Sequence, residues 1–181
     1  MKKLLLAVVL LIPCIAKAQS TGPYNYKSED KYFYYGEVVK VDTALTASDL
    51  YKDAKVFISK LVLISTNFTT DDKTSLIVAD VTEKGTFKNA TGIGSDELMT
   101  LKYTIKLELK PGRYRYTFDN IVITYTEGDK SVAHTLYDLD KSASGVLGNP
   151  RTRRVLKGMD ALFLDNIELL TNTMKKRSDD F

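Results

Sequence analysis

A ten-residue stretch of strictly alternating apolar and polar side chains is the feature that most constrains the fold. Over residues 101–110 the apolar side chains occupy the odd positions, and charged or hydroxyl side chains occupy the even ones. This period of two predicts a β-strand with one buried and one solvated face. Pro111-Gly112 follows, which suits the two central positions of a type II turn. The chain is therefore expected to turn back as an antiparallel hairpin.

The sequence after Gly112 also predicts the register of this hairpin. A turn closed at Pro111-Gly112 sets three apolar pairs opposite one another, namely Leu109 with Tyr114, Leu107 with Tyr116 and Ile105 with Phe118. The same register places Glu108 opposite Arg115 on the solvated face. The apolar positions change from even to odd numbers after Phe118, so a bulge is expected near Asp119-Asn120.

Two segments have the periodicity of amphipathic helices. Thr46 and Asp49 match a capping box, and apolar residues then recur at helical spacing from Leu50 to Leu61. Pro150 suits the first position of a second helix, whose apolar stripe continues to residue 170. With the strands grouped between them, the expected fold class is α+β, an antiparallel sheet packed by two amphipathic helices. Residues 32–174 are expected to form this single domain.

The remaining segments give shorter signals. Aromatic and β-branched residues predict a first strand over 32–42, with Gly36 as a candidate bulge position. Residues 76–81 and 85–91 are expected to pair around Glu83-Lys84, and 131–137 to form a further strand. Residues 138–149 are interpreted as a loop.

The N-terminus has the three parts of a secretory signal. Lys2 and Lys3 precede a short apolar run, and Ala16-Lys17-Ala18 fits a cleavage site before Gln19. We therefore expect a signal peptide over 1–18, a flexible leader over 19–31 and a charged tail over 175–181. The alternative is a lipoprotein anchored through Cys14, although Pro13 is a poor residue before a lipidated cysteine. The expected location is the periplasm or the outside of the cell.

Cleavage after Ala18 would change the charge and remove the thiol. The 26 basic residues would fall to 23 with the loss of three lysines, which equals the 23 acidic residues. A neutral chain lacks the basic footprint of nucleic-acid binding, so no nucleic-acid partner is expected. Cys14, the single cysteine, would also be lost, which excludes disulfides and thiolate chemistry in the mature chain. No later apolar run is long enough to cross a membrane.

Several motifs together resemble a known family. They are residues 35–42 (YGEVVKVD), the helix start at 48–51 and, above all, residues 112–121 (GRYRYTFDNI). The chain resembles exported proteins of Gram-negative bacteria classed as a domain of unknown function with a TBP-like fold. The resemblance implies a curved antiparallel sheet backed by helices. It implies no activity and no site residues, because fold alone does not fix function.

Residues that carry catalytic chemistry are sparse. His134 is the single histidine and cannot build a histidine cluster for zinc. Residues 138–144 space oxygen atoms as a calcium loop does, but Ala143 and Asn149 replace the required Gly and Glu. No metal, cofactor or catalytic residue is predicted. Carboxylates leave one enzymatic alternative, a hydrolase acting on envelope polymers.

Aromatic and basic side chains on the predicted solvated face are the candidate contact residues. Tyr32 and Tyr34 lie on the strand face opposite Phe33 and Tyr35, and tyrosine suits contacts with proteins or sugars. Arg113 and Arg115 could hold an acidic group. The expected function is an exported, non-enzymatic binding module for an envelope protein or small ligand. A self-associating envelope component is a further alternative.

Overall fold

The structure is a computed structural model, and it describes residues 24–175 except 62, 72–74 and 91–94. The predicted signal peptide, its cleavage site, Cys14 and the tail after Lys175 lie outside the described residues.

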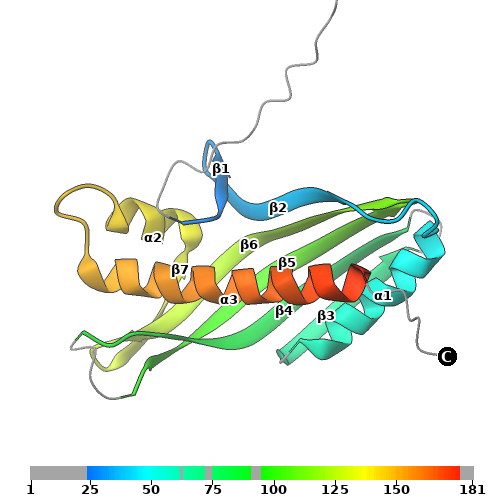
Figure 1. Cartoon of the computed structure of the whole chain (residues 1–181). Helices are drawn as coiled ribbons and strands as arrows, with labels where there is room; N and C mark the ends of the chain where they lie inside the picture. The colour runs from blue at the N-terminus through cyan, green and yellow to red at the C-terminus, as the bar shows by residue number, and fades with distance from the viewer. Residues whose placement is uncertain (1–23, 62, 72–74, 91–94, 176–181) are drawn as a thin grey trace, which may run out of the picture.

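The elements follow the chain in the order β1 (Lys27–Glu29), β2 (Tyr32–Lys40), α1 (Ala47–Lys60), β3 (Leu63–Asp71), β4 (Leu76–Phe87), β5 (Glu97–Lys110), β6 (Arg113–Glu127), β7 (Lys130–Thr135), α2 (Leu136–Ala143) and α3 (Pro150–Lys175). The strands form one seven-stranded antiparallel sheet in the order β1-β2-β6-β5-β4-β3, with β7 also paired to β6. The helices pack on one side of it, and α3 crosses the middle strands (Figure 1). The α+β fold class is confirmed, with α2 as a third helix.

The central hairpin has the predicted register. Leu109 pairs with Tyr114, Ile105 with Phe118 and Glu108 with Arg115. Gly112 has φ +68°, which a type II turn requires at its third position. The predicted bulge is also present: the register shifts opposite Tyr103, and Asn120 has φ +54°.

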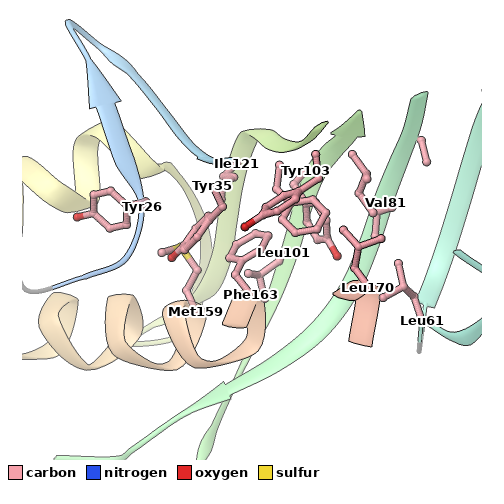
Figure 2. Close-up of a cluster of buried hydrophobic side chains, with 14 of the residues drawn as sticks. Tyr26, Tyr35, Leu61, Val81, Leu101, Tyr103, Ile121, Met159, Phe163 and Leu170 are labelled. Atoms are coloured by element: carbon pink, nitrogen blue, oxygen red, sulfur yellow. The ribbon is translucent and has the colours of Figure 1, made fainter. Parts of the chain in front are cut away.

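One hydrophobic core fills the space between the sheet and the helices. We call the covered surface of the sheet the inner face and the opposite surface the outer face. Phe163 of α3 is fully buried, and its ring centroid lies 4.6 Å from that of Tyr35 and 4.9 Å from that of Tyr103. Figure 2 shows these side chains between the strands and α3. The long helix therefore organises the core across several strands.

The fold begins earlier than the sequence suggested, so the prediction of a flexible leader is wrong for its described part. Residues 27–29 form β1 against β2, and Tyr26 is 5% exposed. Asp160 of α3 accepts hydrogen bonds from the backbone N and the side-chain Nδ2 of Asn25, at 2.9 and 2.8 Å. These contacts are far apart in sequence, so no local pattern indicated them.

Three local predictions are corrected by the structure, and one strand is added. β4 is one strand through Glu83-Lys84 rather than a hairpin, and residues 63–71 form a strand that the sequence analysis did not predict. Residues 136–143 form α2, where a strand to residue 137 and a loop from residue 138 were predicted, and Thr135 accepts from the backbone N of Asp138. Gly36 pairs regularly with Thr117. It allows close approach instead, because an added Cβ would lie 3.0 Å from the Tyr116 carbonyl oxygen.

Candidate functional site

The outer face is the candidate site because no helix packs over it within the described part of the chain. The alternation of β5 and β6 sends their apolar side chains inward and their polar side chains outward. Lys102, Glu108, Lys110, Arg113 and Arg115 are exposed on it. The same period of two that builds the core thus leaves a polar surface on the face of the sheet away from the helices.

Tyr32 and Tyr34 form an aromatic pair on the outer face of β2. Their ring centroids lie 5.3 Å apart with an interplanar angle of 31°, and Tyr32 is 43% exposed. The Tyr32 hydroxyl donates to Oδ2 of Asp119, and the Tyr34 hydroxyl donates to Oε1 of Glu29 at 3.1 Å. Partial burial, followed by the bond to Asp119, raises the pKa of Tyr32. Both hydroxyls therefore stay protonated, and the rings form a fixed apolar platform.

Asp119 anchors this platform and was not singled out by the sequence analysis as a site residue. Its side chain is 1% exposed, and Oδ2 accepts from Lys106 Nζ at 2.6 Å as well as from Tyr32. Its other oxygen, Oδ1, is buried without a hydrogen-bond partner among the described residues. The sequence signal for it was the bulge, because the left-handed residue Asn120 re-aims the strand after Asp119.

Arg113 and Arg115 lie elsewhere on the outer face. Arg115 Nη1 is 3.6 Å from Glu108 Oε1, and both side chains are about half exposed. Arg115 pairs with Val38, four residues along β2 from Tyr34, and Arg113 pairs with Lys40 further on, so at least about 13 Å of strand separates the arginines from the tyrosines. The four predicted contact residues share one face, but they do not form one pocket.

A row of polar side chains crosses the outer face at the level of Asp119. Asp80, Thr104 and Asp119 are directly opposite one another on β4, β5 and β6. Thr104 Oγ1 donates to Asp80 Oδ1 at 2.8 Å and accepts from Asn120 Nδ2 at 3.3 Å. The two carboxylates are two strand spacings apart, about 10 Å. A depression of about 250 Å³ beside Asp80 includes Thr104 and Lys102.

The inner face holds a second buried carboxylate, Glu83, which is 4% exposed. It accepts from the Tyr103 hydroxyl at 2.6 Å and from Asn166 Nδ2 at 2.9 Å. Desolvation raises the pKa of Glu83, although both hydrogen bonds act in the opposite direction. The group joins β4, β5 and α3 within the core, so its position suits bracing rather than substrate contact.

The remaining sequence motifs do not contribute to a cluster of metal-ligating or catalytic side chains among the described residues. His134 Nε2 lies 3.1 Å from Glu127 Oε1, and the imidazole stacks on Tyr125. Asp138 and Asp140 belong to α2, where they do not form a calcium loop. Within the described ranges, His, Cys, Asp and Glu form no group of three that could hold a metal. None of the helices described is long and apolar enough to span a membrane.

Comparison with known proteins agrees with this architecture. Residues 35–124 match the family described as a domain of unknown function (DUF4468) with TBP-like fold. The chain carries a DUF4468 domain. A crystal structure of a DUF4468 family protein from Bacteroides ovatus has a TM-score of 0.68 at 12% identity, and the match covers 87% of this chain and 94% of that one.

A TBP-like protein from Parabacteroides distasonis gives a TM-score of 0.60 at 13% identity, and the match covers 80% of this chain and 96% of that one. These likenesses show the fold, and the family description assigns no activity. The chain has no match among the curated proteins.

Proposed function

We propose that this DUF4468 chain is an exported, non-enzymatic binding module whose outer face contacts a protein of the cell envelope. The carrying observation is a multi-stranded sheet with helices on one face and an open outer face that presents the Tyr32–Tyr34 platform. Val38, 48% exposed beside Arg115, adds an apolar contact near the basic end. Aromatic and arginine side chains are the types that dominate protein interfaces.

The shape of the outer face favours a protein over a small ligand. Its depressions measure about 190 Å³ beside Arg113 and about 250 Å³ beside Asp80. Small-molecule sites more often enclose about 300–1,000 Å³. A broad surface with scattered exposed rings and charges is better suited to contact with the surface of a protein.

The alternative is a carboxylate hydrolase of envelope polymers, for which Asp80 and Asp119 are the available pair. Their spacing is near the upper end of the range for inverting glycosidases, about 6.5–9.5 Å. Asp119 is nevertheless 1% exposed and bonded to Lys106, so its Oδ2 is engaged rather than presented to a substrate. This arrangement fits a structural role for Asp119 beneath the aromatic platform.

Photo-crosslinking in the native envelope tests the contact surface. A benzophenone amino acid replaces Val38 on the outer face in one strain and Val56 of α1 in another, because both valines are nearly half exposed. The expected result is a protein adduct from position 38 that position 56 does not give. Arg115→Glu should reduce this adduct by reversing a charge at the contact.

Two results would reject the proposal. Equal adducts from both positions would show that the contact is not specific to the outer face. The absence of an adduct from either position would argue against a protein partner. Fractionation of the tagged chain tests export separately. A mature mass beginning at Gln19 in the periplasm or medium is expected, and full-length protein in the cytoplasm would contradict it.

A further inference from the structure

We infer that a groove between α3 and the end of β4 binds a medium-chain fatty-acid carboxylate. The groove encloses about 520 Å³, a volume within the usual range for small-molecule sites. It lies at the edge of the sheet, apart from the outer-face contacts proposed above. The inference therefore does not depend on the proposed function.

The apolar residues of the lining lie side by side along α3 and β4. Gly158 packs against Thr86 and Phe87, and Leu162 packs against Gly85, so helix and strand run in opposite directions. Leu98 of β5, 67% exposed, adds an apolar side chain to the lining. From Arg154 to Leu162 the helix rises about 12 Å, which suits an acyl chain of medium length.

The charges in the groove are unequal at its two ends. Arg154 and Lys157 precede Gly158 on the same side of α3, and no ion pair of either is found among the described residues. Arg154 Nε is buried and has no hydrogen-bond partner among the residues that the structure describes. Lys88 is paired with Asp96 at 3.0 Å. An anionic head group is therefore expected at the Arg154 end.

A carboxylate head satisfies this end best. A guanidinium binds carboxylates through two parallel hydrogen bonds. At the other end of the groove, Lys84 and Asp165 carry opposite charges, so this end has no net charge and offers a carboxylate less than the Arg154 end does. The ligand class is thus a chain with one negative head and an apolar tail.

An extended peptide fits the same groove less well. β3 pairs with β4 only as far as Glu83, which leaves the last residues of β4 beyond that pairing. Thr86 directs its carbonyl oxygen at α3, however, where a Cβ on Gly158 would lie 2.3 Å away. The helix therefore covers the edge at this point, and a strand added to β4 would lose its backbone partner.

Titration with decanoate, followed by amide NMR shifts, tests the site. Saturable shifts are expected at Gly85, Leu98 and Gly158, and 1-decanol should bind at least tenfold more weakly. The double variant Arg154→Gln/Lys157→Gln should weaken decanoate binding at least tenfold. The matched control is Lys102→Gln/Lys110→Gln, which makes the same charge change on the outer face and should bind decanoate normally.

Thermal melts of both double variants check that each one folds. Equal affinity for decanoate and decanol would overturn the carboxylate assignment. Shifts outside the groove, or equal weakening by the control variant, would overturn the site. Saturation by an acidic decapeptide at the same amides, without decanoate binding, would assign the groove to a peptide.

Discussion

Buried carboxylates differ in their hydrogen bonding between the two faces of the sheet. On the inner side, Glu83 accepts two hydrogen bonds and Asp160 accepts three. On the outer side, Asp119 is buried as deeply, but one of its oxygens lacks a partner among the described residues. The inner carboxylates join elements that are distant in sequence, whereas the outer one supports an exposed aromatic pair. Stability and recognition are thus expected to separate by face.

The largest effect should come from removing the central ring of the inner side. Phe163→Ala is expected to lower the free energy of unfolding by about 3–5 kcal/mol, because the ring is fully buried among Tyr35, Tyr103 and Phe118. Urea denaturation measures this. The matched outer-face change, Val38→Ala, should stay within about 0.5 kcal/mol. Similar losses at both positions would break the comparison.

Asp160→Asn should give the next largest loss, about 1–3 kcal/mol. The amide keeps one acceptor oxygen and places an N–H₂ group either against Asn25 Nδ2 or against the backbone N of Asn25 and the Tyr35 hydroxyl. Hydrogen exchange at residues 25–29 should accelerate in the variant, because Asp160 ties this segment to α3. Asp165→Asn, exposed on the same helix, is the control. Unchanged exchange at residues 25–29 would show that Asp160 does not hold this segment against α3.

Glu83→Gln should change the pH dependence of stability. Burial raises the folded-state pKa of Glu83 above the ordinary value of 4.5, so its protonated form is favoured in the fold. That stability is fully present below pH 4.5 and is lost as the pH rises through the raised pKa. The variant should gain stability relative to wild type as the pH rises through this window. Urea melts from pH 4 to 8 measure the difference.

The exposed variant Glu108→Gln is the control for this pH series, because its side chain is half solvated. It removes one carboxylate at an exposed position, which separates the effect of burial from that of net charge. A parallel pH profile for wild type and Glu83→Gln would show that the inner carboxyl titrates normally.

The smallest effect is expected at the outer ion pair. Arg115→Ala should change the free energy of unfolding by less than about 1 kcal/mol, because Arg115 and Glu108 are 3.6 Å apart and exposed. A double-mutant cycle with Glu108→Ala measures their coupling. A coupling above about 1 kcal/mol would assign the pair a structural role and weaken the case for a free contact surface.

Local patterns predicted the parts of the fold that depend on near neighbours. The alternation before Pro111-Gly112 and the parity change after Phe118 gave the hairpin register and the bulge. The Thr46–Asp49 capping box gave the start of α1. β3 was missed because its apolar and polar residues do not alternate clearly. α2 was missed although Thr135 and Asp138 repeat the capping pattern of α1, because residues 131–137 were assigned to a strand and 138–149 to a loop. The tyrosines and arginines were placed on the correct face, but their separation depended on the pairing of β2 with β6.

The sequence by itself therefore determined the fold class, the central hairpin and which side chains face away from the core, because these follow from period and turn chemistry. Only the tertiary structure decided that Asn25 is held by Asp160, that Asp119 lies beneath Tyr32, and that Arg154 borders a groove on β4. Each of these contacts joins residues many positions apart. Their geometry is fixed by how strands and helices pack, and no local pattern encodes that.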